Sequence, residues 1–295
     1  MSQRLRNIFL VSFAGLFLVL LPVFLLTVER RPARTEPVQV FADYIKAAYA
    51  RDFRRAYRFI SGRDRRLKKE ETYVRERGAF TGFTLDVTRK LSEFVEFEPT
   101  HVRLEGDRAR IKLKLRFPDA DSLSGLLLDW NEEKLNGLPK TEQKRILMML
   151  VGLKDKMTMI EGEEESMLVK EGPAWRVFLD WASAVRVNFS AAVPDIGTIE
   201  AAPVTKQTVI RPKEPFTIAY RVKNRTQRDI FARVVHRVEP KGLAQHLTML
   251  ECSLILPVRL APGEQTEYST TYLIDGDLPE TTKELRVTYE FKLES

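Results

Sequence analysis

The side chains best suited to soft-metal chemistry lie near the end of the chain, in the stretch ECSLILPVRLAPGE (residues 251–264). Cys252 is the single cysteine of the 295-residue sequence, so no disulfide can form within the chain. His246 and Met249 precede it and are further donors for a soft metal ion. On an extended strand, positions 246 and 252 are about 20 Å apart and position 249 faces the opposite side. These three residues therefore predict no metal site within one chain unless the chain bends.

Other candidates for chemistry are few. Five of the seven methionines crowd into one region, which indicates either a copper-binding patch or, as we favour, gap-filling hydrophobic residues on an amphipathic helix: Met148, Met149, Met157, Met159 and Met167. We expect His101, which lies in a strand pattern, to be a surface or hydrogen-bonded histidine. The sequence contains no phosphate-binding glycine loop, nucleophile elbow or paired-histidine motif. We therefore expect no enzyme, the alternative being an acid–base pair of Asp43 with Tyr44 in a pocket.

The first element expected from hydropathy is a membrane anchor. Ile8–Val28 contains 21 residues without a charge, and at about 1.5 Å per residue a helix of this length crosses a hydrocarbon core of roughly 30 Å. The run is longer than the apolar core of a signal peptide and ends in TVERRPAR, which is no small-residue cleavage site. We predict that residues 1–30 are a cytoplasmic tip and a retained single-pass transmembrane helix.

Helical and strand patterns alternate over residues 36–182 and predict an α+β domain, with helices on a curved antiparallel sheet. Two helical segments come first, followed by a hairpin around Gly106, an inserted helical region at about 120–160 and a hairpin around Gly172. The motifs AAYARDFRRAYRFIS, LEGDRARIKLKLRF and EGPAWRVF resemble the nuclear-transport-factor-like (SnoaL-type) cone fold. That resemblance implies a pocket for a small ligand or substrate, but no particular chemistry.

Residues 184–295 change to short alternating strands separated by turns, which predicts an all-β, Ig-like sandwich. The motifs VRVNFSAAV, HRVEP, LAPGE and IDGDLPETTKELRVTYEF follow one another as in the cytochrome c oxidase assembly proteins of the CtaG type, which this region resembles. The resemblance implies copper delivery to a haem-copper oxidase subunit. It also implies a single-pass protein of the bacterial plasma membrane, or less readily the mitochondrial inner membrane, with a cytoplasmic N-terminus and a periplasmic β-domain.

The family motif carries two cysteines, Cys-Phe-Cys-Phe, and this sequence keeps one of them. Counting back from Pro262-Gly263-Glu264 places the first cysteine at Cys252 and the second at Leu254. Two hypotheses follow: Cys252 is a vestigial thiol in an assembly factor that acts by binding a partner, or it holds Cu(I) across a homodimer with one thiolate from each chain. No cofactor other than Cu(I) is indicated.

Positive charge is concentrated in Arg51–Lys69, which holds nine basic and two acidic residues. This net charge of +7 equals the formal excess of the whole chain. The run predicts either a surface for anionic lipid headgroups or two solvated helix faces. Nucleic acid is not an expected partner, because no platform of aromatic residues accompanies the charge.

Overall fold

The computed structural model describes residues 36–119, 132–153, 156–276, 278–279 and 281–294. Residues 36–295 form one compact unit. Its helices are α2 (Pro37–Tyr49), α3 (Phe53–Phe59), α4 (Gly62–Arg65), α5 (Glu70–Arg77), α6 (Gly82–Ser92), α8 (Glu132–Asn136), α9 (Lys140–Leu153), and the 3-10 helices η2 (Trp181–Ser183) and η3 (Lys241–His246). Its strands are β1 (Glu96–Glu105), β2 (Arg108–Pro118), β3 (Met159–Glu171), β4 (Ala174–Phe178), β5 (Val185–Ala192), β6 (Ile199–Pro203), β7 (Gln207–Ile210), β8 (Phe216–Asn224), β9 (Ile230–Glu239), β10 (Leu247–Cys252), β11 (Val258–Leu260), β12 (Gln265–Ile274) and β13 (Glu284–Glu294).

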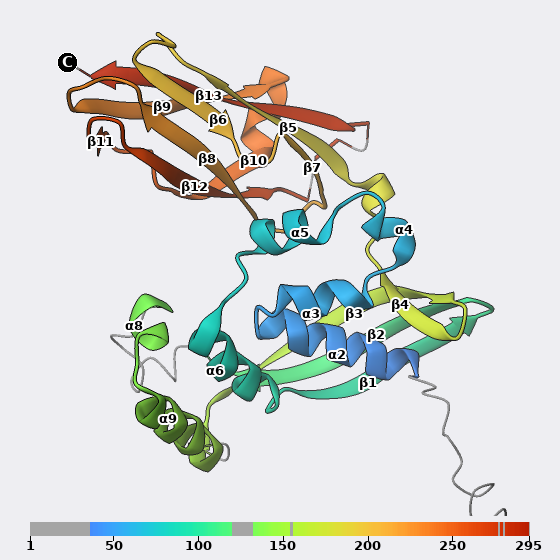
Figure 1. The fold of residues 1–295 in the computed structure, drawn as a ribbon. Coiled ribbons are helices and arrows are strands. Elements are labelled where there is room, and N and C mark those ends of the chain that lie inside the picture. Colours follow the sequence, from blue (N-terminus) through green and yellow to red (C-terminus); the bar gives the residue numbers. More distant parts are fainter. Residues whose placement is uncertain (1–35, 120–131, 154–155, 277, 280, 295) are drawn as a thin grey trace, which may run out of the picture. The chain divides into compact units, whose positions relative to one another are not determined.

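The first sheet has the order β1-β2-β3-β4, and helices α2 and α3 cover one of its faces (Figure 1). All neighbouring strands in this sheet are antiparallel. Tight turns at Gly106 and Gly172, each with a positive φ, join β1 to β2 and β3 to β4, whereas a longer segment that contains α8 and α9 joins β2 to β3. Strand β2 alternates basic residues with the buried Ala109, Ile111 and Leu113. These apolar side chains pack in one core with Val40 and other residues of α2 and α3.

Two further sheets enclose a second core. Their orders are β10-β12-β8-β6 and β11-β9-β13-β5-β7. Strand β13 lies in the centre of the five-stranded sheet, parallel to β5 and antiparallel to β9. Large buried side chains come from both sheets, and the rings of Tyr220 (β8) and Tyr289 (β13) are stacked with their centroids 3.8 Å apart. Strand β10 is an edge strand of the four-stranded sheet.

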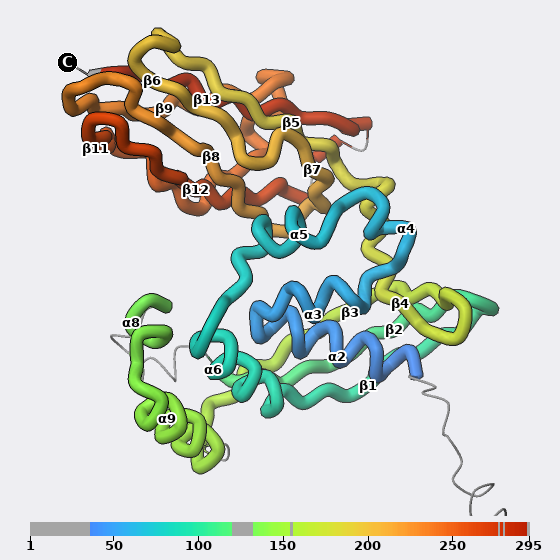
Figure 2. Tube along the Cα trace, viewed as in Figure 1, coloured from blue at the N-terminus to red at the C-terminus, as the bar shows by residue number. Residues whose placement is uncertain are grey.

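Helices α6, α8 and α9 share a smaller apolar cluster. Its buried members are Phe83, Val87, Leu91, Phe94, Leu135, Ile146 and Leu150. Figure 2 traces the chain from α5 through residues 78–81 into α6. Asn136 joins α8 to α6, because its side-chain oxygen accepts a hydrogen bond of 3.0 Å from the backbone N–H of Thr84.

The fold-class prediction, an N-terminal transmembrane helix followed by an α+β cone-like domain and an Ig-like sandwich, is wrong as stated. The expected helix at Ile8–Val28 lies outside the described residues, and no helix within the described ranges is long and apolar enough to cross a bilayer. The longest of these helices, α9, has 14 residues and extends about 21 Å at 1.5 Å per residue, short of the roughly 30 Å of a hydrocarbon core. The described chain is mostly β-structure, arranged in three sheets.

The predicted domain limits, 36–182 and 184–295, stay a prediction. Helix α5 makes polar contacts with the part of the chain that contains the later strands. Arg77 at the end of α5 forms an ion pair of 2.7 Å with Glu214, which precedes β8. Glu76 of α5 also forms a buried ion pair of 2.8 Å with Lys68, which precedes the helix.

Candidate functional site

Cys252 is the last residue of the edge strand β10, and its side chain is half-buried. Three groups surround the sulfur. Thr270, its register partner on β12, donates a hydrogen bond to Sγ at 3.3 Å, and the backbone N–H of Leu254 donates another at 3.4 Å. The third group is the imidazole of His236, whose Nε2 lies 3.6 Å from Sγ. The thiol therefore faces the interior between the two sheets of the second core.

His236 reaches Cys252 from the opposite sheet. It lies on β9, where the inward alternation of Ile230, Ala232 and Val234 continues to position 236. Its ring contacts that of Tyr289, the register partner on β13, at a centroid distance of 4.3 Å. A thiol and an imidazole from two different sheets are thus held together by the packing of the sandwich.

Two buried tyrosines fix the protonation of the imidazole. Tyr272 donates its hydroxyl hydrogen to the hydroxyl of Tyr289 at 2.9 Å, while its oxygen lies 2.5 Å from Nδ1 of His236. Because that hydrogen is already used, Nδ1–H donates to Tyr272 and Nε2 keeps its lone pair toward Cys252. Burial lowers the pKa of His236 and raises the pKa of Tyr272 and Tyr289, so all three groups are neutral near pH 7.

This geometry suits a pair of metal donors. A sulfur at about 2.3 Å and a nitrogen at about 2.0 Å from one ion lie about 3.5 Å apart when the angle between them is tetrahedral. The observed Sγ–Nε2 distance is 3.6 Å. Among the described residues, no group of three or more His, Cys, Asp or Glu side chains could hold a metal ion. Two donors are too few for a closed four-ligand zinc site, whereas a thiolate and an imidazole are both donors that Cu(I) accepts, and the 3.6 Å separation fits an ion that takes a further ligand from outside the pair.

The structure changes the expected roles of the neighbouring residues. A bulge at Leu250 shifts the register of β10, so that Met249 pairs with Tyr272 and Cys252 with Thr270. Tyr272 and Thr270 are two apart on β12, so Met249 and Cys252 share one side of the sheet, contrary to the prediction of opposite sides. The histidine beside Cys252 is His236, whereas the predicted donor His246 ends the 3-10 helix η3.

Leu254, which stands at the position of the missing cysteine, lies in a turn after the end of β10. Its side chain is buried in the same core that Cys252 borders. Residues 252 and 254 therefore do not lie on one continuous strand, because β10 ends at Cys252.

Large apolar side chains are exposed around the thiol. Met249 and Leu250 lie on β10, and Ile255 and Leu256 lie in the following turn, the last being 72% exposed. Water-exposed apolar groups gathered at the unpaired edge of a sheet are typical of a surface that another protein covers. Cys252 is thus a half-buried thiol at the border of an apolar surface.

The predicted acid–base pair is not assembled. Tyr44 lines a cavity of about 520 Å³ between α2, the first sheet and residues 211–215, and its hydroxyl lies 3.5 Å from that of Tyr73. Burial raises the pKa of Tyr44, which keeps the phenol neutral. Asp43 is not part of that lining and accepts a hydrogen bond of 3.1 Å from Gln39 at the surface.

The remaining predicted donors lie apart. His101 is exposed on β1. Met148 and Met149 are exposed on α9, and Met157 packs on the cluster of α6, α8 and α9. Met159 is the first residue of β3, and Met167 lies further along the same strand. The five methionines are therefore spread over α9, β3 and the segment between them.

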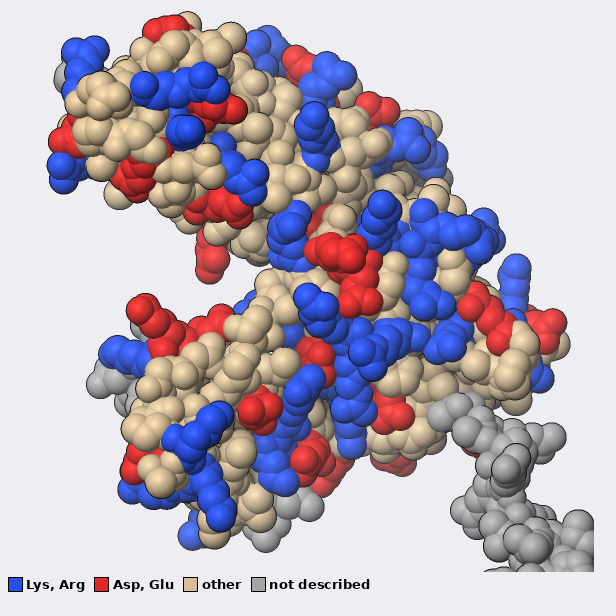
Figure 3. Space-filling view, in the orientation of Figure 1, with Lys and Arg blue, Asp and Glu red and all other residues tan. Residues whose placement is uncertain are grey.

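The basic run Arg51–Lys69 becomes the surface of α3, α4 and the adjoining turns. Both of its acids are buried: Asp52 caps α3, and Asp64 accepts hydrogen bonds from the backbone of Leu179 and Trp181. The basic side chains point mostly outward, and Figure 3 shows Lys and Arg gathered over α3 and α4. Seven of the nine are exposed: Arg51, Arg54, Arg55, Arg58, Arg63, Arg66 and Lys69.

The family model for the cytochrome c oxidase assembly protein CtaG/Cox11 matches residues 150–292, a little under half of the chain. This match contains Cys252 and His236 and supports the CtaG-type resemblance of the C-terminal region. It begins at residue 150, and the nuclear-transport-factor-like resemblance of the middle region is not confirmed.

Two relatives from different organisms are both named as cytochrome c oxidase assembly proteins. The mitochondrial cytochrome c oxidase assembly protein COX11 of Saccharomyces cerevisiae is 24% identical over 99 residues, covering 34% of this chain and 33% of the relative. The cytochrome c oxidase assembly protein CtaG of Sinorhizobium medicae is 26% identical over 112 residues, covering 36% of this chain and 57% of the relative. The similarity thus spans about a third of the Saccharomyces cerevisiae protein and somewhat over half of the Sinorhizobium medicae protein.

A solved structure, Escherichia coli alpha-2-macroglobulin activated by porcine elastase, aligns with 68% of this chain and 21% of its own at 9% identity. The TM-score of 0.21 is too low to indicate a shared fold.

Proposed function

We propose that this protein is an assembly factor for a cytochrome c oxidase and acts by binding a partner, without catalytic turnover. The observation that carries the proposal is the CtaG/Cox11 family-model match over residues 150–292, together with two relatives named as oxidase assembly proteins. The partner we propose is a subunit of a haem-copper oxidase. The bulk of the chain then works on the periplasmic side of the membrane that holds the oxidase.

The partner surface that we propose is the apolar border of Cys252. Its most exposed members, Ile255 and Leu256, follow an edge strand whose outer backbone groups have no neighbouring strand within the described sheet. A partner strand or loop laid along β10 would cover these side chains and would come within reach of the thiol.

A genetic experiment tests this function in the organism that encodes the chain. We expect deletion of the gene to lower oxidase activity, and the unmodified gene to restore it. A double substitution Leu250→Glu and Leu256→Glu should fail to restore activity, because two carboxylates would have to be buried in the interface. The matched control is Leu104→Glu, which changes an exposed leucine of β1 and should restore activity fully. Unchanged oxidase activity after deletion would contradict the proposal.

A second function, Cu(I) carriage, is favoured by the pair of Cys252 and His236. The sequence offers one thiolate per chain, so a Cu(I) site made of two thiolates would have to be shared by two chains. A neutral imidazole nitrogen 3.6 Å from the sulfur supplies a second donor within one chain. In this role Cu(I) is cargo, and the half-exposed thiol at the apolar border is the point from which it would be handed on.

Copper titration separates the hypotheses for Cys252. With a competing chelator, a site made by Cys252 and His236 should take one Cu(I) per chain, with one sulfur and one nitrogen ligand by X-ray absorption. Both Cys252→Ser and His236→Gln should abolish it, whereas His246→Gln should leave it intact. One Cu(I) per two chains with two sulfur ligands would instead support the homodimer. Binding unaffected by Cys252→Ser would leave partner binding as the sole function of this region.

A further inference from the structure

A groove lies between the turn that joins α2 to α3 and the chain that joins α5 to α6. Its volume is about 420 Å³. Apolar side chains that are half-buried form much of its lining: Val74, Ala79, Phe80 and Leu85. The exposed charged side chains that line it are all arginines: Arg51, Arg54 and Arg75. The groove therefore combines an apolar lining with a cationic rim.

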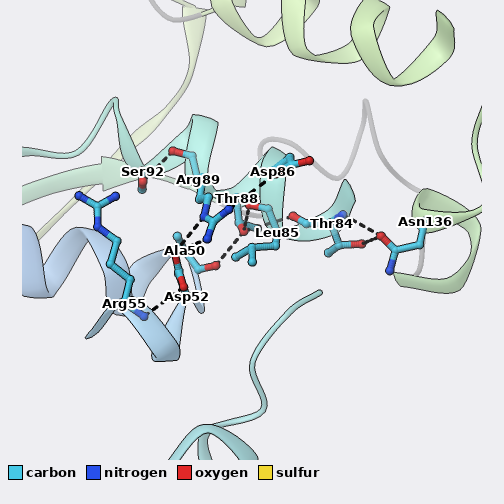
Figure 4. A network of polar contacts seen from close by, with 10 residues as sticks. All are labelled: Ala50, Asp52, Arg55, Thr84, Leu85, Asp86, Thr88, Arg89, Ser92 and Asn136. Carbon is cyan, nitrogen blue, oxygen red and sulfur yellow. Dashed lines mark hydrogen bonds and ion pairs between the residues drawn. The ribbon is translucent and has the colours of Figure 1, made fainter. Parts of the chain in front are cut away.

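The single carboxylate in the lining does not offset these arginines. Asp52 is buried, and its oxygens accept hydrogen bonds from the backbone N–H of Arg55 at 3.2 Å and from the guanidinium of Arg89 at 2.8 Å (Figure 4). Arg54 forms an ion pair of 3.7 Å with Glu70 that is open to solvent, so an anion in the groove can compete for it. The rim thus carries positive charge that its own surroundings do not neutralise.

The walls are tied together by hydrogen bonds that use no side chain of the lining. Thr88 of α6 donates a hydrogen bond of 2.7 Å to the carbonyl of Ala50, and the backbone N–H of Phe80 donates one of 3.3 Å to the carbonyl of Arg51 (Figure 4 shows the first). The two walls of the groove are therefore fixed relative to each other.

Arg51 is held in an unusual conformation at this rim. Its φ of 53° lies in the left-handed region, where glycine or asparagine costs less. Its guanidinium lies 4.8 Å from the centroid of the Phe80 ring. A cation–π contact uses none of the five N–H donors of the guanidinium, so these stay available for an oxyanion.

We propose that this groove binds an amphipathic anion, with a phosphate or carboxylate headgroup at Arg51, Arg54 and Arg75 and the first part of an alkyl chain along Val74, Phe80 and Leu85. The headgroup matches the charge of the rim, and the alkyl chain matches the lining, which a free inorganic ion would leave exposed to water. This inference is independent of the proposed role in oxidase assembly.

Calorimetry on the full chain tests the proposal with octyl phosphate below its micelle concentration. We expect one octyl phosphate per chain, bound about tenfold or more tightly than inorganic phosphate or octanol, because only the amphiphile uses both rim and lining. The double substitution Arg54→Gln and Arg75→Gln should weaken binding about tenfold or more. The matched control, Arg58→Gln with Arg66→Gln, removes the same charge from the same run outside the groove and should change affinity less than twofold.

A second variant guards against a loss of folding. Leu85→Glu replaces a half-buried lining residue on α6 with a helix-compatible carboxylate, which should repel the headgroup while circular dichroism stays unchanged. The proposal is overturned if inorganic phosphate binds as tightly as octyl phosphate, which would mean a simple anion site. It is also overturned if octanol binds as tightly, or if the control pair loses as much affinity as Arg54→Gln with Arg75→Gln.

Discussion

Two surfaces of this protein are rich in basic residues, and acidic side chains pair with these residues on one surface far more than on the other. On the first sheet, Lys112 and Lys114 of β2 face Glu163 and Glu161 of β3, with N–O distances of 2.6 and 3.0 Å. On α3 and α4 the neighbouring acids are buried and occupied by backbone hydrogen bonds, so the outward arginines face water. Within the described ranges, for example, no ion pair involves the side chains of Arg55, Arg58 or Arg66.

The contrast shows that net charge in a sequence segment does not by itself mark a binding surface. Strand β2 is as basic as the helices, but glutamates on the neighbouring strand β3 neutralise its charge. These ion pairs keep one face of the sheet exposed to water. Apart from the solvent-exposed pair of Arg54 with Glu70, the charge of α3 and α4 is not cancelled, because Asp52 and Asp64 point inward. The helical surface is therefore the one available to an anionic partner.

The largest effect should come from Asp64→Asn. The Asp64 carboxylate accepts the backbone N–H of Trp181 at 2.8 Å, the backbone N–H of Leu179 at 2.9 Å and the hydroxyl of Ser61 at 2.6 Å. The asparagine amide has one oxygen that accepts hydrogen bonds and one NH2 group that only donates, so it cannot replace both carboxylate oxygens. We therefore expect a loss of about 3 kcal/mol in the free energy of unfolding. Urea denaturation measures it, with the exposed Asp86→Asn as control. A loss no larger than that of the control would show that this buried acid is not structural.

The next effect concerns binding to anionic vesicles. Removing Arg58 and Arg66 together should weaken binding of residues 36–295 to phosphatidylglycerol vesicles by about 2 kcal/mol, since each basic residue near such a surface contributes about 1 kcal/mol. Removing Lys112 and Lys114 makes the same change in charge on the first sheet and should weaken vesicle binding far less. Vesicle sedimentation at low and high salt measures both. Equal losses would remove the distinction between the two surfaces.

A smaller effect, on the melting temperature, is expected when the β-sandwich region is separated from the preceding part of the chain. A chain from Ser183 to Ser295 keeps both sheets of the second core but loses the ion pair of 2.7 Å between Arg77 and Glu214. We expect a cooperative melt with a β-type circular dichroism spectrum, at a temperature about 5 °C below that of residues 36–295. A broad, non-cooperative transition in several such chains would indicate one shared core instead of two regions.

The smallest effect is a dependence of stability on pH at Glu264. Hydrogen bonds from the backbone N–H of Ala261 at 2.7 Å and from Thr266 at 2.9 Å hold the pKa of this carboxyl below its usual value of 4.5. A lowered folded-state pKa means that this stabilisation is present above pH 4.5 and is lost as the pH falls through the folded-state pKa. Glu264→Gln should therefore lower the melting temperature slightly at pH 7, and the difference should shrink toward pH 3. A constant difference would show that titration of Glu264 plays no part.

Local features of the fold could be predicted from the sequence because their signals lie within a few residues. The turn at Gly106 and the alternation of Ile111 and Leu113 with lysines predict the hairpin β1–β2, which the structure contains. The basic run lies on helices α3 and α4 and the adjoining turns, and its two alternatives, a surface for anionic lipid headgroups or two solvated helix faces, stay open. The transmembrane helix, in contrast, was predicted from hydropathy, and the described residues include no such helix.

The candidate site was predicted only in part, because its second half lies on another strand. Cys252 stood out as the single cysteine, but a sequence does not show that β9 and β10 face each other across a sandwich. His236 could have been found from the inward alternation that runs from Ile230 to Val234 along β9. The bulge at Leu250 has no comparable local signal, and it reverses the predicted side of Met249.

The central position of β13 determines when the sandwich can close during synthesis of the chain. This strand is the last of the described elements to be synthesised, yet it completes the five-stranded sheet by joining β5 to β9. Until it arrives, the facing edges of β5 and β9 lack their hydrogen-bonding partner, and the buried Tyr289 is missing from the contacts of Tyr220 and His236. The sandwich therefore cannot close progressively from its N-terminal side. A ribosome that stalls or a protease that trims before Glu284 leaves a half-built core, and the thiol loses the wall that holds its histidine in place.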